Sequence, residues 1–148
     1  LNVYLQTEKK SDDALKMLIN YLKDYDEKVI LLFFGDHQPK TNTEVIDEDE
    51  ENKYKVSYLI WANYDIEEKD YGDTSANYLQ SILIETAGLP KDAYTNYITE
   101  LRKKIPVITA NYYIGDNNQK YMLDDKESPY YEYIKEYEKI VYYNIFDQ

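Results

Sequence analysis

The sequence predicts an α/β fold that forms part of a doubly wound, mainly parallel sheet with flanking helices, plus a C-terminal hairpin and helix. Three observations predict it. Residues 11–25 repeat apolar side chains at helical spacing. Residues 29–34 form a continuous apolar run, which is typical of a strand covered on both faces, and Gly35 ends the run. A helix followed by a buried strand is the repeating unit of a doubly wound fold.

The first helix has two candidate starts and ends near Tyr25. Residues 11–13 could cap a helix, because their side-chain oxygens suit free backbone N–H groups. Leu1, Tyr4 and Leu5 could instead continue the apolar face upstream, and we favour this longer helix. The apolar face itself consists of Ala14, Leu15, Leu18, Ile19 and Leu22.

The middle of the chain predicts a strand and a helix after a polar connection. Residues 40–53 are hydrophilic and predict a surface loop, and residues 56–62 predict a second strand. Residues 73–75 precede a helix with an apolar face, which we expect to end at Gly88 and Pro90 because these residue types stop helices.

The C-terminal third predicts a short helix, a hairpin and a last helix. Residues 92–104 carry apolar side chains on one side of a helix. Residues 107–114 and 120–123 predict two strands, and the turn chemistry of residues 115–118 between them favours a β-hairpin. The last helix is expected to start near Ser128, with a proline in its first turn. No domain linker is visible.

Composition limits the classes of protein to which the chain could belong. Its 148 residues fit one domain with a hydrophobic core. A net charge of −12 argues against binding nucleic acid or docking a basic patch on anionic lipid. The absence of cysteine excludes disulfides and cysteine-based zinc sites. No apolar run is long enough to span a bilayer, and no signal peptide is visible. Because the chain starts at Leu1 and not at a methionine, we expect it to be an excerpt of a longer protein.

The sharpest local signal is Gly35-Asp36-His37, directly after the first predicted strand. Ligand sites in open α/β sheets form where strands end, and glycine permits a tight turn there. A carboxylate and an imidazole together suit Mn²⁺ or Zn²⁺ and suit Ca²⁺ less well. The competing interpretation is that Asp36 caps a turn and His37, the only histidine, is an ordinary polar residue, since two ligands do not make a catalytic site.

The chain resembles the sulfatase-type domain of lipoteichoic acid synthases and their relatives, which belong to the alkaline phosphatase/sulfatase superfamily. The matching pieces follow family order and cover residues 1 to about 106. Gly-Asp-His alone is a modest motif, and its combination with the flanking pieces is much more specific. The pieces are Leu1–Thr7, Ser11–Tyr25, Val29–Phe34, Gly35–Pro39, Tyr58–Asp65, Thr74–Leu79 and Ala87–Pro90.

The resemblance implies that Asp36 and His37 ligate a divalent metal, usually Mn²⁺ or Mg²⁺. In the family an acidic residue of the first strand and a threonine nucleophile complete the site, and both lie upstream of Leu1. Residues 1–148 would then be the C-terminal portion of a single catalytic domain, with no catalytic residue of their own, and would be inactive alone. The threonine takes phosphoglycerol from phosphatidylglycerol and passes it to a growing polymer.

The same resemblance implies partners and a location. The chain would pair with the upstream half of its own domain. The parent would handle a phosphatidylglycerol-type head group and a cell-surface polymer. Membrane-spanning helices further upstream would place this soluble segment at the extracellular face of the cell membrane.

Several alternatives stay open. Thr41 and Thr43 lie just past the metal pair, and we interpret them as loop residues. Trp61 and Tyr64 could line a substrate groove or pack in the core, and no substrate-binding residue can be assigned. The protein could be a sulfatase or another phospho-head-group transferase of the superfamily. It could also be a non-catalytic acidic α/β module that binds a partner or a glycan through a surface drawn from its 19 tyrosines.

Overall fold

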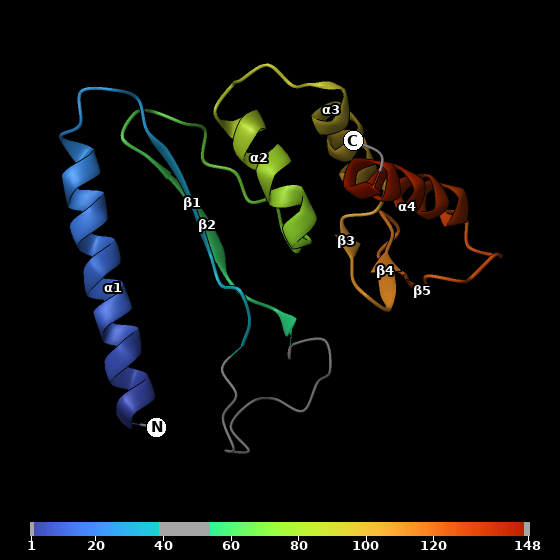
Figure 1. The fold of residues 1–148 in the computed structure, drawn as a ribbon, viewed down its shortest axis with the longest axis horizontal. Helices are drawn as coiled ribbons and strands as arrows, with labels where there is room; N and C mark the ends of the chain where they lie inside the picture. Colours follow the sequence, from blue (N-terminus) through green and yellow to red (C-terminus); the bar gives the residue numbers. More distant parts are fainter. Residues whose placement is uncertain (1, 39–53, 147–148) are drawn as a thin grey trace. The chain divides into compact units, whose positions relative to one another are not determined.

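The structure, a computed structural model, describes residues 2–38 and 54–146 and divides into two compact units, residues 1–66 and 67–148. Figure 1 shows the helices and the small sheets of both units. The predicted α/β class is confirmed, because helices and strands follow one another along the chain. In the described parts both sheets are antiparallel, with strand orders β1-β2 and β3-β4-β5.

The first unit begins with helix α1, which spans Asn2–Lys23 and confirms the longer of the two predicted helices. No residue of α1 is buried, although Leu15, Ile19 and Leu22 are half-buried. Val3 and Met17 remain about three-quarters exposed, at 77% and 73%. The apolar face of α1 is therefore only partly covered within its own unit.

Strands β1 (Ile30–Phe34) and β2 (Tyr58–Ala62) pair antiparallel, with Ile30 opposite Ala62 and Phe34 opposite Tyr58. The sequence predicted a mainly parallel sheet, and the described strands contain no parallel pair. A parallel pair needs a crossover connection, usually a helix. No α-helix lies between β1 and β2 in the described residues 35–38 and 54–57. The two strands follow one another along the chain and pair antiparallel, as the strands of a hairpin do.

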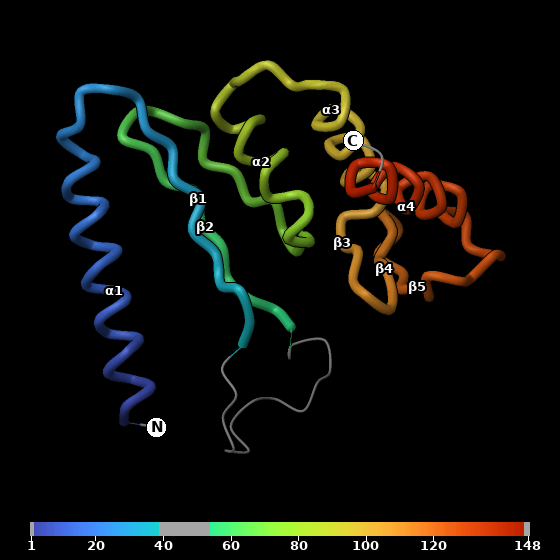
Figure 2. The backbone as a smooth tube through the Cα atoms, viewed as in Figure 1, coloured from blue at the N-terminus to red at the C-terminus, as the bar shows by residue number. Residues whose placement is uncertain are grey.

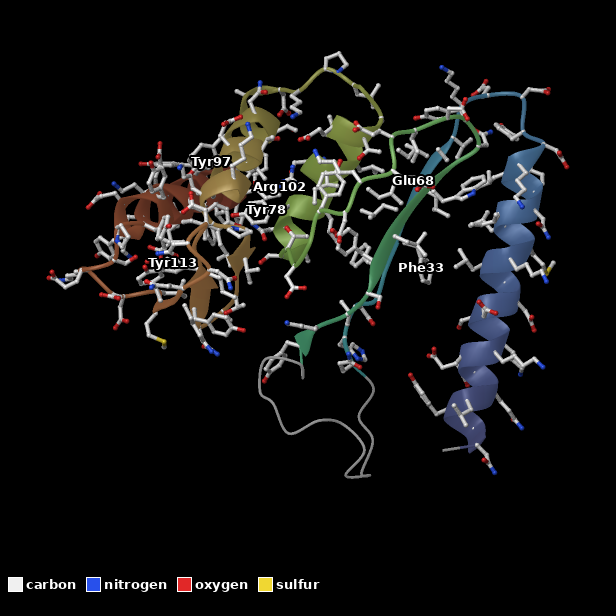
Figure 3. The ribbon with its side chains drawn as sticks, turned by 180° about the vertical axis from the view of Figure 1, so that it is seen from behind. Phe33, Glu68, Tyr78, Tyr97, Arg102 and Tyr113 are labelled. Atoms are coloured by element: carbon white, nitrogen blue, oxygen red, sulfur yellow. The ribbon has the colours of Figure 1, made fainter. Side chains whose placement is uncertain are left out.

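The apolar run of β1 is less covered than predicted. Phe33, labelled in Figure 3, is 45% exposed, and Phe34 and Leu59 remain exposed to a similar extent. Apolar side chains on a strand normally pack against another layer. The sequence pattern predicts a layer that covers this face of β1. The described residues of the first unit do not provide it.

The side chain of Asn63 joins the end of α1 to the hairpin. Its amide nitrogen donates to the carbonyl oxygens of Leu22, Tyr25 and Glu27 at 3.1, 3.3 and 2.9 Å. Its amide oxygen accepts the N–H of Val29 at 2.8 Å, and its own N–H donates to the Val29 carbonyl at 3.1 Å. One half-buried residue therefore bonds to the backbone of four residues in the turn between helix and strand.

The second unit contains a short 3₁₀ helix, three α-helices and a three-stranded sheet, and its path is easiest to follow in Figure 2. Its elements are η2 (Ala76–Tyr78), α2 (Leu79–Thr86), α3 (Ala93–Lys104), β3 (Val107–Ile108), β4 (Tyr112–Ile114), β5 (Lys120–Met122) and α4 (Tyr131–Phe146).

The expected hairpin is confirmed as β4–β5, but the predicted strand 107–114 is broken into β3 and β4. The break lies at Thr109, whose Oγ1 accepts the N–H groups of Asn111 and Tyr112 at 3.2 and 3.0 Å. A threonine hydroxyl that binds nearby N–H groups competes with strand pairing. The local side-chain bonds therefore turn the chain back on itself and add a third strand.

Both predicted boundaries around α2 and α3 are confirmed. Gly88 has a φ of 66°, and the N–H of Leu89 donates to the Ile84 carbonyl at 3.1 Å, which is the bond that closes a Schellman motif. Asp92 caps α3, since its Oδ1 accepts the Thr95 N–H at 2.7 Å.

Tyrosines form much of the second unit's core, and the hydroxyl groups of the two fully buried ones have partners there. Tyr78 and Tyr113, both labelled in Figure 3, are fully buried. The Tyr78 hydroxyl donates to the Ile105 carbonyl at 2.8 Å, and the Tyr113 hydroxyl donates to Ser128 Oγ at 2.6 Å. Such bonds let large aromatic surfaces be buried without a desolvated hydroxyl. The other buried apolar residues are Leu79, Ile82, Ile98, Leu101, Ile105, Tyr130 and Ile134.

An ion cluster around Glu85 ties α2 to its surroundings. The Glu85 carboxylate lies 3.2 Å from Lys91 Nζ, 3.2 Å from Arg102 Nη2 and 3.6 Å from Lys69 Nζ. Arg102, labelled in Figure 3, is 12% exposed, so its charge is largely removed from water. Burial raises the pKa of Glu85, but the hydrogen bond and charge of Lys91 and the charges of Arg102 and Lys69 outweigh it, and the pKa falls below its ordinary value of 4.5.

We expect Asn63→Asp to destabilise the first unit by about 2 kcal/mol, because three carbonyls lose their donor and face a carboxylate. Urea unfolding followed by the fluorescence of Trp61 measures the loss. Asn20→Asp, at an exposed position of α1 in the same unit, is the control. Equal losses in the two variants would contradict a joining role for Asn63.

We expect Glu85→Gln to lower stability at pH 7 by about 1–2 kcal/mol, because the poorly hydrated Arg102 loses its anionic partner. The folded-state pKa of Glu85 is lowered, so its ionic contribution is present above the unfolded-state pKa and is lost as the pH falls through the folded-state pKa. The difference in the free energy of unfolding between wild type and variant should therefore disappear as the pH falls below about 4.5. Urea unfolding at several pH values tests this, with the exposed Glu100→Gln as control. A gap that stays constant with pH would refute the ionic interpretation.

Candidate metal site

The loop after β1 begins with a close approach to the other strand. The Gly35 N–H donates to the Ser57 carbonyl at 3.1 Å and continues the β1–β2 pairing by one residue. A Cβ added at Gly35 would lie 3.0 Å from the Cβ of Val56. A side chain at position 35 would push the two backbone segments apart, so glycine is needed for this close approach. Asp36 and His37 follow at the carboxyl end of β1.

The structure brings the side chains of Asp36 and His37 together. His37 Nε2 lies 3.6 Å from Asp36 Oδ2, and Asp36 Oδ1 accepts the backbone N–H of His37 at 2.9 Å. Both side chains are accessible, with 86% of Asp36 and 75% of His37 exposed. Two ligand atoms about 2.1 Å from one cation lie no more than about 4.2 Å apart, and the separation of Nε2 and Oδ2 falls within that limit.

The backbone carbonyl of Gln38 holds the other ring nitrogen of His37, with 2.9 Å between Nδ1 and the oxygen. A carbonyl oxygen only accepts, so Nδ1 is the donor of this bond, and in the neutral ring Nε2 is then the nitrogen that can bind a metal. This is the orienting partner that a metal-ligating histidine normally has. Sequence analysis did not find it, because a main-chain carbonyl leaves no signal in the residue types.

The ligand set is incomplete within the described chain. A catalytic metal usually has about three protein ligands and an open position. Residues 2–38 and 54–146 hold no group of three or more histidine, cysteine or acidic side chains that could bind a metal. Asp36 and His37 thus have the chemistry and spacing of part of a site for Mn²⁺, Mg²⁺ or Zn²⁺.

The other sequence candidates lie at the opposite end of the β1–β2 hairpin or outside the described residues. Trp61 is half-buried and stands opposite Leu31 in the sheet. Tyr64 is half-buried with Lys28 Nζ 5.2 Å from its ring centroid. Thr41, Thr43 and the whole of the predicted surface loop 40–53 fall outside the described residues.

The late tyrosines divide between core and surface. Tyr130 is buried and its hydroxyl donates to Asp116, while Tyr137 is half-buried and accepts from Asn77 at 3.2 Å. Tyr142 and Tyr143, near the end of α4, are 59% and 58% exposed. Packing therefore accounts for Tyr130 and Tyr137, while Tyr142 and Tyr143 remain at the surface.

The chain is thus an α/β protein with an Asp-His pair directly after a strand. Comparison with known protein families identifies the family to which it belongs. The sequence profile of the sulfatase family matches residues 1–89, which include β1, β2 and the Asp-His pair. The match covers more than half of the chain, and the chain therefore belongs to the sulfatase family. The resemblance found in the sequence is confirmed at this level. Members of this superfamily usually depend on a metal ion.

Two known proteins are similar to the chain over most of its length. A protein of Rhizobium meliloti (strain 1021) described as a cyclic β-1,2-glucan modification protein is 25% identical over an alignment of 134 residues, and the match covers 80% of this chain and 21% of the relative. The structure of the Streptococcus pyogenes phosphoglycerol transferase GacH in complex with sn-glycerol-1-phosphate matches with a TM-score of 0.66 and 21% identity. That match covers 90% of this chain and 31% of GacH, and it shows a shared fold.

Among the described residues, no helix combines the length and the apolar character that crossing a bilayer requires.

Proposed function

We propose that the chain is the metal-binding C-terminal part of a sulfatase-superfamily phosphoglycerol transferase that acts in the synthesis of lipoteichoic acid or a related cell-surface polymer. The observation that carries the proposal is the Asp36–His37 pair, with 3.6 Å between Oδ2 and Nε2 and with Nδ1 held by a carbonyl. Membership of the sulfatase family and the fold shared with GacH support it.

Asp36 and His37 would hold the metal through a hard anionic oxygen and a neutral nitrogen. A divalent cation there would offset charge on phosphoryl oxygens and make a hydroxyl nucleophile easier to ionise. Asp36 supplies the negative charge that retains a cation at the surface. The Nδ1–H bond keeps the His37 ring in the tautomer whose Nε2 can bind a metal. The chain's own role is therefore to present two ligands in a fixed relation.

The remaining parts of the site would come from an upstream half of the same domain, which would supply the threonine nucleophile and a further acidic ligand. The exposed apolar side chains of β1 and α1 support this partner, because Phe33, Phe34 and Met17 are the kind of surface that a neighbouring layer covers. The chain also spans only about a third of GacH and about a fifth of the Rhizobium relative.

The substrate would be a phosphatidylglycerol-type head group. The fold neighbour is a phosphoglycerol transferase in complex with sn-glycerol-1-phosphate, which has the same chemistry as such a head group. The polymer acceptor and the lipid donor would place the parent at the extracellular face of the cell membrane.

A second candidate is a related head-group transferase that modifies a glucan. The similarity to a cyclic β-1,2-glucan modification protein favours it. The metal pair and the donor would be the same, and only the acceptor would differ. Supplying the full-length protein with a labelled phosphoglycerol donor and either polyglycerol phosphate or a β-glucan separates the two functions by the product formed.

We expect Asp36→Asn and His37→Ala, made in the full-length protein, to weaken Mn²⁺ binding and to lower phosphoglycerol transfer by about 100-fold or more, because each removes a ligand that stabilises developing charge. Titration of Mn²⁺ by electron paramagnetic resonance measures binding, and release of diacylglycerol measures transfer. Asp12→Asn on the exposed surface of α1 is the control. Unchanged metal binding and transfer in His37→Ala would instead favour the non-catalytic binding module.

We expect residues 1–148 expressed alone to show no phosphoglycerol transfer and no sulfate-ester or phosphodiester hydrolysis, since the proposed nucleophile and third ligand would be missing. The same assays on the full-length protein are the reference. Robust, metal-dependent turnover by the isolated chain would show that the nucleophile lies within it.

A further inference from the structure

We propose that Gln38 is a positioning residue for the metal pair: its side chain anchors the loop so that its own carbonyl oxygen holds His37 Nδ1. The inference deepens the proposed function and rests on it. Gln38 would touch neither metal nor substrate. It would act through His37, and its effect would be on how tightly the metal binds.

The loop that carries the ligands is fixed at both ends to the same opposing segment. At the near end, the Gly35 N–H donates to the Ser57 carbonyl at 3.1 Å. At the far end, the Gln38 side-chain Nε2 donates to the Lys55 carbonyl. Asp36 and His37 lie between these two anchors. Strand pairing holds the near end, and a side chain holds the far end.

The far anchor matters because packing does not fix the ligands. The side chains of Asp36 and His37 are 86% and 75% exposed, so few neighbours restrict their rotation. Their geometry depends on hydrogen bonds, and the bond at His37 Nδ1 comes from a main-chain atom whose place is set by the loop. Holding the Gln38 side chain restricts that carbonyl.

The chemical consequence concerns the tautomer and orientation of His37. With the Gln38 carbonyl in place, Nδ1 donates to that oxygen and Nε2 lies 3.6 Å from Asp36 Oδ2. If the loop end is released, the ring can rotate and either nitrogen can carry the proton. Binding a metal must then restore one tautomer and one orientation, and the affinity falls. Losing such a support to a ligand typically costs 10–100-fold in metal affinity or activity.

Gln38→Met tests the anchor, because methionine keeps the length and neutrality of glutamine and removes the donor. We expect the Kd for Mn²⁺ of the full-length protein, measured by electron paramagnetic resonance, to rise about tenfold. We expect transfer activity to return toward the wild-type kcat at saturating Mn²⁺, a split that general unfolding would not produce. Gln80→Met, at an exposed position of α2, is the matched control and should leave the Kd unchanged. Gln38→Asn keeps the amide but shortens its reach, and should also weaken binding.

The outcomes separate this inference from the proposed function. If Asp36→Asn and His37→Ala bind Mn²⁺ like the wild type, the metal site itself is wrong and the proposed function fails with it. If those two variants lose binding while Gln38→Met and Gln38→Asn keep the wild-type Kd, the metal site stands and the positioning role is overturned. Thermal unfolding of each variant identifies any that does not fold, and the remaining Gln38 variant then decides.

Discussion

The first unit depends on the hydrogen bonds of one side chain, the amide of Asn63. Little apolar surface is buried between α1 and the β1–β2 hairpin, and no residue of α1 is buried. Burial therefore cannot be what sets the turn from helix to strand. The amide does so by bonding to three carbonyls and one N–H of the turn. These hydrogen bonds set where β1 starts. They therefore also set where Asp36 and His37 lie at the far end of β1.

The second unit is held by a different kind of interaction. Its core combines isoleucine and leucine with tyrosines whose hydroxyl groups reach a carbonyl or a serine. Burial supplies the stabilisation, and the hydroxyl bonds select one packing arrangement among those that burial alone would allow. The ion cluster at Glu85 adds a charge-dependent contribution. The unit that carries the proposed metal pair is thus fixed mainly by directed bonds, and its neighbour in the chain mainly by packing.

Sequence reasoning succeeded where the determining interactions are local. Gly88 and Asp92 mark helix ends through their own backbone preference and capping oxygen, and the apolar runs mark the strands. It placed Asp36 and His37 together because they are adjacent and follow a strand. It failed where distant residues decide. The antiparallel pairing of β1 with β2 and the bonds of Asn63 join segments that lie far apart in the sequence, and the support given to His37 by the Gln38 carbonyl depends on a loop conformation that residue types do not encode.

The single tryptophan of the chain gives the two units separate optical reporters. Trp61 lies in β2, opposite Leu31, so its emission responds to the hairpin of the first unit. The fully buried rings of Tyr78 and Tyr113 lie in the second unit and contribute to its near-ultraviolet dichroism. Two wavelengths in one denaturation experiment therefore distinguish a chain that unfolds as one cooperative body from one that loses its hairpin first.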